Sequence, residues 1–83
     1  MWRVYLLQCS DGSLYAGIAR DVRKRLATHR SGRGSRYVRS RLPVRLVYQE
    51  SCRTRSRALK REAEIKGWTR RRKLALLAAA VRL

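Results

Sequence analysis

The fold is decided by residues 1–19, MWRVYLLQCSDGSLYAGIA. Residues 2–8 are mostly β-branched, aromatic or Leu, and a second apolar run covers residues 14–18. Between the two runs lies Ser-Asp-Gly-Ser, and an Asp-Gly pair between apolar runs is the usual sign of a tight turn. We therefore expect a β-hairpin that turns at Asp11-Gly12.

A helix is predicted to follow the hairpin. Val22, Leu26 and His29 lie at positions i, i+4 and i+7, which is the spacing of one helix face. Asp21 precedes this face and is placed to cap the helix, because a carboxylate at the N-terminus accepts hydrogen bonds from free backbone N–H groups. The helix is expected to end near residues 31–32, Ser-Gly.

Residues 30–41 are predicted to form a mobile, exposed loop. They include two glycines, three serines and five arginines, but only Tyr37 and Val38 are apolar. A loop of this composition is a candidate clamp for phosphate groups, because guanidinium groups bind phosphate oxygens well. Its candidate nucleic-acid contacts are Arg30, Arg33, Arg36, Tyr37, Arg39 and Arg41.

The second half of the chain completes a small α/β domain. Pro43 opens a third strand over residues 44–49, where Val44, Leu46 and Tyr48 alternate with Arg45 and Val47. A second helix is expected over residues 54–66, with Gly67 as its stop, and a third helix begins at Thr69. The order β-β-α-β-α-α predicts a single domain over residues 1–83, an α/β (α+β) fold with a small three-stranded, mostly antiparallel sheet flanked by three helices.

The net charge is the strongest indication of a partner. Lys and Arg number 22 against 5 Asp and Glu, which gives +17, and this excess repels itself in a compact fold. Of these 22 residues 18 are Arg, whose planar guanidinium binds phosphate oxygens in pairs. Nucleic acid is the favoured partner, ahead of an anionic membrane surface and an acidic protein.

Nothing in the sequence indicates export or structural zinc. Cys9 and Cys52 form no CxxC pair, and His29 is not spaced with them as a zinc ligand. The apolar run in residues 1–12 is too short for a signal peptide, and residues 74–81 are far fewer than the roughly 20 needed to span a bilayer. We expect a cytoplasmic protein with free thiols and no membrane insertion.

Glu62 is the first candidate for chemistry. On a helix that turns about 100° per residue, Glu62 falls between Ala58 and Leu59 on the face that carries Ile65, whereas Glu64 points nearly the opposite way. Two interpretations stay open. Glu62 forms a buried ion pair with an arginine, or it ligates a hard cation such as Mg²⁺ or Mn²⁺, which suits carboxylate oxygen.

Arg25 and His29 form a second candidate pair, at i and i+4 on the first predicted helix. They are either a solvated Arg beside a partly buried His, or a pair in which Arg25 holds a phosphate while His29 orients it or moves a proton. Tyr5 and Tyr15 lie on the paired strands. Tyrosine is common there, so their positions alone indicate only sheet packing.

Together these residues resemble the GIY-YIG nuclease superfamily, and most closely its small stand-alone bacterial members. Val4-Tyr5-Leu6 stands where the first tripeptide of that family would be, and Tyr15-Ala16-Gly17 stands where the second would be. Arg25 lies ten residues after the second tyrosine and His29 four further on, as in the family. The family's metal ligand, a Glu on a later helix, falls on Glu62.

The resemblance implies a metal-dependent endonuclease that hydrolyses phosphodiester bonds in DNA, directed by substrate structure rather than by sequence. Its catalytic residues would be Tyr5, Tyr15, Arg25, His29 and Glu62, with one Mg²⁺ or Mn²⁺ ion on Glu62 and with Tyr5 as the base or its relay. Further nucleic-acid contacts would be Gly17, Lys66, Arg70, Arg71 and Arg72. DNA is favoured over RNA, and a protein partner is a candidate source of specificity. The alternative is a basic nucleic-acid-binding module with the same fold and little or no catalytic activity.

The two tyrosines conflict with the simplest hairpin turn. A two-residue turn at Asp11-Gly12 pairs Tyr5 with Ile18, which places Tyr5 and Tyr15 on opposite faces of the sheet. If both tyrosines serve one site, the hairpin needs a bulge or a different loop length. The chain also contains no Asn, a residue that many family members carry near the end of the domain.

Overall fold

The computed structural model describes residues 1–81, and the predicted elements occur there in the predicted order. Strands β1 (Trp2–Gln8), β2 (Leu14–Ala19) and β3 (Arg45–Cys52) form one antiparallel sheet in the order β2-β1-β3. The helices of these residues are α1 (Val22–Arg30), α2 (Arg36–Arg39), α3 (Arg55–Lys66) and α4 (Arg70–Val81). Residues 82 and 83, which the predicted domain includes, lie outside the described residues.

The hairpin turns at Asp11-Gly12, as predicted, but through a three-residue loop, which excludes the simple two-residue turn and leaves the alternative of a different loop length. The backbone N–H of Cys9 donates to the carbonyl of Ser13 at 2.9 Å, which leaves residues 10–12 as the loop. Gly12 ends this loop with a φ of +83°, a conformation that residues with a side chain rarely adopt.

This loop places the two tyrosines on the same face of the sheet. The register pairs Tyr5 with Gly17, two residues along β2 from Tyr15. Side chains two residues apart on a strand point to the same face, and so do those of paired residues. A site shared by both tyrosines requires their side chains on one face of the sheet, and the three-residue loop provides this.

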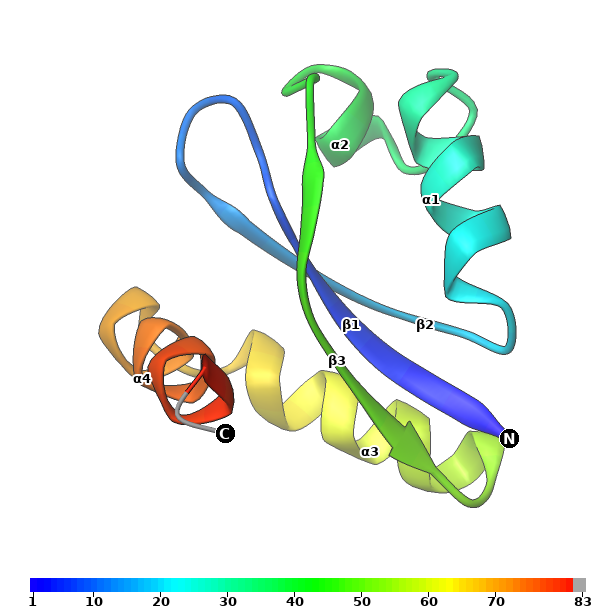
Figure 1. Ribbon diagram of the computed structural model, residues 1–83, viewed down its shortest axis with the longest axis vertical. Helices are drawn as coiled ribbons and strands as arrows, with labels where there is room; N and C mark the ends of the chain where they lie inside the picture. Colours follow the sequence, from blue (N-terminus) through cyan, green and yellow to red (C-terminus); the bar gives the residue numbers. More distant parts are fainter. Residues whose placement is uncertain (82–83) are drawn as a thin grey trace.

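A hydrophobic core lies on each face of the sheet. On one face, α1 and α2 bury Val22 and Val38, and on the other, α3 buries Ala58 and Ile65 (Figure 1). Asp21 caps α1, as predicted, because its side chain accepts a hydrogen bond from the third N–H of the helix. The sheet is therefore a middle layer whose outer strand β2 leaves an open edge between α1 and α3.

The cysteines agree with the prediction of free thiols, and the C-terminal helix packs on the core. Cys9 is buried, Cys52 is half-buried, and both are free thiols. Leu76 and Leu77 of α4 pack against the core that α3 covers, so the apolar face of α4 closes this core. Among residues 1–81, every helix is too short or too polar to traverse a bilayer.

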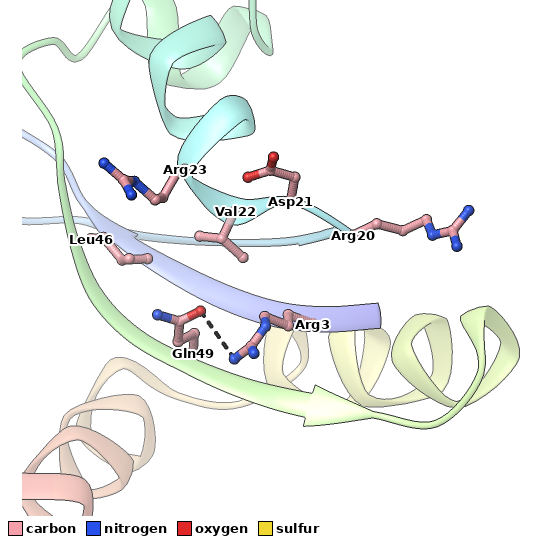
Figure 2. A pocket seen from close by; sticks show the side chains of 7 residues that line it. All are labelled: Arg3, Arg20, Asp21, Val22, Arg23, Leu46 and Gln49. Atoms are coloured by element: carbon pink, nitrogen blue, oxygen red, sulfur yellow. Dashed lines mark hydrogen bonds between the residues drawn. The ribbon is translucent and has the colours of Figure 1, made fainter. Parts of the chain in front are cut away.

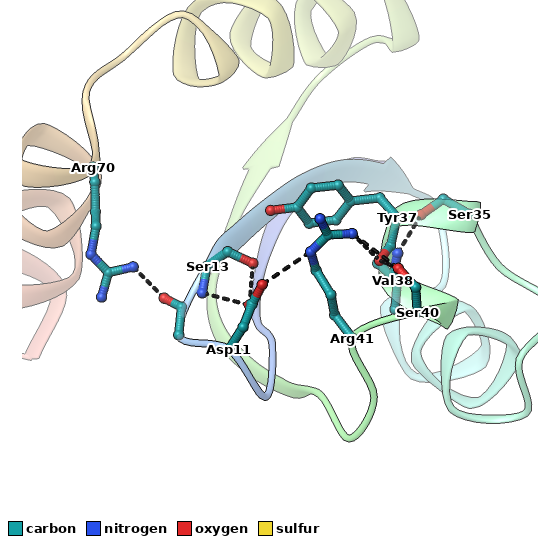
Figure 3. Close-up of polar contacts among 9 residues, drawn as sticks. Asp11, Ser13, Ser35, Tyr37, Val38, Ser40, Arg41 and Arg70 are labelled. Carbon is teal, nitrogen blue, oxygen red and sulfur yellow. Dashed lines mark hydrogen bonds and ion pairs between the residues drawn. The ribbon is translucent and has the colours of Figure 1, made fainter.

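Residues 30–41 are largely exposed, as predicted, but they are not all loop, because α2 forms within them as a helix that was not predicted. Ser35 Oγ accepts a hydrogen bond from the Val38 N–H at 3.2 Å and caps α2, whose Val38 is fully buried. The Arg41 guanidinium then donates to the Asp11 carboxylate at 3.0 Å, which ties the segment to the hairpin loop (Figure 3). One buried side chain and one ion pair therefore attach this stretch of loop-like composition to the rest of the fold.

Strand β3 is longer than predicted and contains a β-bulge. It extends to Cys52 because its last residues pair with the start of β1. Its register with β1 shifts after Leu6, and the shift places Leu46 against the α1 core but Tyr48 against the α3 core. The predicted alternation therefore holds only up to the bulge.

Candidate active site

A pocket of about 270 Å³ opens at the edge of β2, and its wall contains four of the five predicted catalytic residues. They come from four elements: Tyr5 from β1, Tyr15 from β2, Arg25 from α1 and Glu62 from α3. Because β2 is the outer strand, α1 and α3 reach this edge from opposite faces of the sheet. The structure thus brings a guanidinium, a carboxylate and two phenols into one pocket.

Gly17 allows the close approach on which the pocket depends. A Cβ built on Gly17 would lie 2.5 Å from the Tyr5 Oη and 2.6 Å from its Cζ. Any side chain at position 17 would therefore push the Tyr5 ring out of place. Gly17, predicted as a nucleic-acid contact, lines the pocket and also determines where Tyr5 lies.

His29 lies behind Tyr5 rather than in the pocket wall. It is 2% exposed, and its Nε2 is 2.8 Å from the Tyr5 Oη. The Tyr15 ring meets the imidazole edge-on, with ring centres 5.6 Å apart. Within residues 1–81 the His29 Nδ1 has no hydrogen-bond partner. Because an orphaned buried N–H is rarer than an orphaned acceptor, we assign the proton to Nε2, which then donates to the Tyr5 oxygen.

Gly34 lies against this imidazole, and the sequence did not single it out. A Cβ at Gly34 would overlap the His29 Nδ1. In the sequence, Gly32 and Gly34 of the basic stretch indicated only a flexible loop. The packing of one of them on a buried histidine depends on how α1 and α2 meet, which no local pattern reports.

Burial sets the protonation of Tyr5 and His29. Desolvation raises the pKa of Tyr5 well above its usual value of 10.0; the neighbouring Tyr15 adds to the increase, and the charge of Arg25 offsets only part of it. Desolvation, and then the Arg25 charge, lower the pKa of His29 below 6.5. Both groups are therefore neutral at pH 7, and a neutral phenol suits a relay or an orienting role better than that of an anionic base.

Glu62 pairs with Lys66, so the interpretation as an ion pair with an arginine is wrong. The Lys66 Nζ is 3.5 Å from the Glu62 Oε2 and 5.7 Å from the centre of the Tyr15 ring. The Glu62 side chain is 18% exposed and that of Lys66 is 51% exposed. An exposed partner of this kind stabilises a pair by only about 0–1 kcal/mol, so a cation can displace it. Lys66, predicted as a nucleic-acid contact, lies beside the pocket.

The donor set fits a hard divalent cation held by one protein carboxylate. Within residues 1–81 there is no group of three or more His, Cys, Asp or Glu side chains. Mg²⁺ usually keeps several waters and binds through one or two carboxylates together with phosphate oxygens. Glu62, partly exposed in a pocket with room for water, is the residue that would hold Mg²⁺ or Mn²⁺ in this way.

Tyr37 and Arg41 belong to a stack that reaches the pocket. The Tyr37 ring stacks on Tyr15, with centres 5.9 Å apart, and the Arg41 Cζ lies 3.8 Å from the centre of the Tyr37 ring. Both residues were predicted to contact nucleic acid. The structure shows that they also hold Tyr15 in place from the side of α2.

The other predicted nucleic-acid contacts are exposed and fall into two groups. The first group surrounds α2 and consists of Arg30, Arg33, Arg36 and Arg39. The second lies in the first turn of α4 and consists of Arg70, Arg71 and Arg72. Arg70 donates to the carbonyl of Gly12, so the second group is fixed to the hairpin loop (Figure 3).

The sheet, the two tyrosines on one of its faces, the Arg and Glu at the edge of β2 and the His behind Tyr5 define a GIY-YIG type of catalytic domain. The profile of the GIY-YIG catalytic domain matches residues 1–75, and the chain belongs to this family. A UPF0213 protein of Staphylococcus aureus (strain N315) is 55% identical over 74 residues, which cover 89% of this chain and 90% of that protein.

Two solved structures are similar over nearly the whole chain. The solution structure of a UPF0213 protein from Bacillus halodurans is 40% identical, with a TM-score of 0.61, and the match covers 95% of this chain and 85% of that one. The solution structure of a protein from E. faecalis is 37% identical, with a TM-score of 0.65 and coverage of 98% and 86%. Within the GIY-YIG family, the chain therefore belongs with the UPF0213 proteins.

Proposed function

We propose that this chain is a divalent-metal-dependent endonuclease that hydrolyses phosphodiester bonds in DNA. The family match places the domain in a nuclease superfamily. The observation that carries the finer proposal is the meeting of Tyr5, Arg25 and Glu62 in one pocket, with His29 bonded to Tyr5 behind it. Phosphoryl transfer needs a group that binds the phosphate, a group that binds the cation and a hydroxyl that orients water, and Arg25, Glu62 and Tyr5 can provide them in that order.

Each side chain of the pocket has a distinct part in this proposal. Arg25 is exposed and would bind a non-bridging oxygen of the scissile phosphate, where its charge stabilises the charge that develops in the transition state. Glu62 would hold Mg²⁺ or Mn²⁺, and an ion bound there supplies Lewis-acid polarisation of the phosphate. Tyr15 forms the adjoining wall and is held by Tyr37 on its other side.

Tyr5 and His29 would position the attacking water. The Nε2–H of His29 donates to the Tyr5 oxygen, so the hydroxyl proton of Tyr5 remains free to point into the pocket. There it can orient a water molecule against the phosphate or pass a proton along. Fixed dipoles of this kind cost no reorganisation when the reaction occurs.

Basic side chains beyond both ends of the pocket favour cleavage at an internal bond of a nucleic-acid strand. Past the Ala19 end of β2 lie Arg20 and Lys24, and past the Leu14 end lie Arg70 and Lys73. A nucleic-acid strand that contacts the basic residues at both ends of β2 would have bound phosphates on each side of the scissile bond. These contacts grip the backbone without reading bases, which favours selection by substrate structure rather than by sequence.

Two observations favour the alternative of a binding module with little activity. The ammonium of Lys66 neutralises Glu62, and burial keeps Tyr5 protonated. If the cation does not displace Lys66, the fold would bind nucleic acid without cutting it.

The decisive experiment compares cleavage by the wild type, Glu62→Gln and Glu64→Gln. Glu64 is the matched control, because it lies on the same helix, is 54% exposed and pairs with Arg61 outside the pocket. Labelled linear, nicked, flapped and branched DNA, and RNA, are incubated with each protein and Mg²⁺ or Mn²⁺. We expect Glu62→Gln to lose cleavage and Glu64→Gln to keep it. Equal products from wild type and Glu62→Gln would refute the proposed site, and tight, salt-sensitive binding without products would favour the binding module.

A further inference from the structure

We propose that the surface around the N-terminus of α1 is a second nucleic-acid-binding site, which takes the phosphate backbone beyond the cleavage point. We call it the α1 surface and define it by Arg3, Arg20, Arg23 and Lys24. The inference rests on the proposed function for the identity of the ligand, because it describes where the same nucleic acid continues. Its binding step is tested without any cleavage.

Two hollows form the α1 surface, and both are larger than the catalytic pocket. One, of about 410 Å³, contains Arg20, Lys24 and Arg25. The other, of about 440 Å³, contains Arg3, Arg20 and Arg23 (Figure 2). Leu46 and Gln49 of β3 also line the second hollow, so it reaches from α1 across to the strand at the far side of the sheet.

The hollows adjoin the catalytic pocket. The pocket that contains Glu62 shares Arg25 with the first hollow, and the first hollow shares Arg20 with the second. A phosphate chain held at Arg25 therefore meets Arg20 and then the hollow between Arg3 and Arg23. The shared Arg25 favours the nucleic acid in the pocket as the occupant over a lipid surface or an acidic protein, because a separate partner would compete for Arg25.

Among residues 1–81, none of the basic side chains that define this surface forms an ion pair with a carboxylate. Arg3 donates to the neutral side-chain amide of Gln49 at 3.5 Å (Figure 2). The Arg20 Cζ lies 5.9 Å from the centre of the Trp2 ring. Among residues 1–81, ion pairs with carboxylates occur only at three other basic residues, Arg41, Arg61 and Lys66. The guanidinium groups of the α1 surface are therefore available to an anion.

The single acidic residue in the two hollows is occupied elsewhere. Asp21 accepts a hydrogen bond from the Lys24 N–H at 3.1 Å, as the cap of α1. Figure 2 shows its carboxylate on the helix side of the hollow, away from Arg3 and Gln49. It therefore leaves the side of the hollow that contains Arg3 open to a phosphate.

The test measures the salt dependence of DNA binding in two variants of equal charge. Arg20→Gln/Arg23→Gln removes two charges from the α1 surface. Arg57→Gln/Lys60→Gln removes two charges from exposed positions on α3 that line none of these hollows. Both variants carry Glu62→Gln, so that a labelled duplex stays intact, and binding is followed by fluorescence anisotropy at several salt concentrations.

We expect the slope of log K against log salt to fall by about 2 in the α1 variant, since each lost phosphate contact removes about 0.9. When salt rises from about 50 to 200 mM, the affinity of the α1 variant for DNA should fall by a factor about tenfold smaller than that of the Glu62→Gln protein. The control should change the slope by less than about 0.5. Equal changes in the two variants would overturn the inference while leaving the proposed cleavage intact. A selective loss of binding to phosphatidylglycerol vesicles, with DNA binding unchanged, would overturn it in favour of a membrane surface.

Discussion

Replacing Gly17 by Ala tests how the sheet positions Tyr5. The added methyl group would lie 2.5 Å from the Tyr5 Oη and 2.6 Å from its Cζ, well inside van der Waals contact. Tyr5 is 2% exposed and is bonded to His29 at 2.8 Å, so its ring cannot move without breaking this contact. The substitution should therefore affect both the stability of the protein and the pocket.

The expected cost follows from three contributions. Overpacking a core typically costs about 1–3 kcal/mol, and loss of a buried hydrogen bond costs roughly 1 kcal/mol. Against this, a Gly to Ala change at an unstrained position stabilises by about 0.4–1 kcal/mol through the unfolded chain, and Gly17 has no positive φ. The net loss is about 2 kcal/mol, which lowers the Tm of a domain of this size by roughly 8–16 °C.

The assay is thermal unfolding of Gly17→Ala beside Gly67→Ala. Gly67 is a suitable control, because its φ is −79° and a Cβ there would meet only ordinary contacts at 3.5 and 3.7 Å. Gly67→Ala should leave Tm unchanged or slightly higher, and Gly17→Ala should lower Tm and reduce DNA cleavage. If Gly17→Ala is as stable as Gly67→Ala, the reasoning about Tyr5 is refuted.

Three further perturbations test other parts of the molecule. Val38→Ala should cost about 2 kcal/mol in urea unfolding because Val38 is fully buried, and a negligible cost would mean that the segment around α2 is not packed. The folded-state pKa of His29 is lowered, so the unfolded chain binds more protons and stability falls as the pH drops below about 6.5. His29→Gln should remove this loss between about pH 7 and 5, and equal pH slopes for the two proteins would contradict the burial argument. Lys66→Met frees Glu62 and should tighten Mn²⁺ binding, measured without nucleic acid by calorimetry, about two- to fivefold, whereas weaker binding would argue against Glu62 as the ligand.

Much of the fold and part of the site could be predicted from local patterns. The hairpin runs, the cap at Asp21 and the stop at Gly67 are short-range features, and the structure contains each of them. The inward direction of Glu62 followed from helix periodicity, because Ala58 and Ile65 on the same helix are buried. Such features need no knowledge of what packs against them.

Other features depend on contacts between distant segments. Val38 looked like one apolar residue in a polar stretch, and only its place on the buried side of α2 shows that it is core. One of the two interpretations of Glu62 paired it with an arginine, yet its partner is Lys66, one turn along the same helix. The contact of Gly34 with His29, and the bulge in β3, likewise arise from tertiary packing.

The scarcity of ion pairs has a consequence for the lifetime of the protein. Within residues 1–81 most basic side chains have no carboxylate partner, so the folded chain carries a repulsive strain that a bound polyanion relieves as a counterion. A ligand at about 100 times its Kd adds roughly 2.7 kcal/mol to the stability of the folded state. Protein molecules bound to nucleic acid would then resist proteolysis, and unbound molecules would be degraded first. The amount of this protein would follow the amount of its substrate.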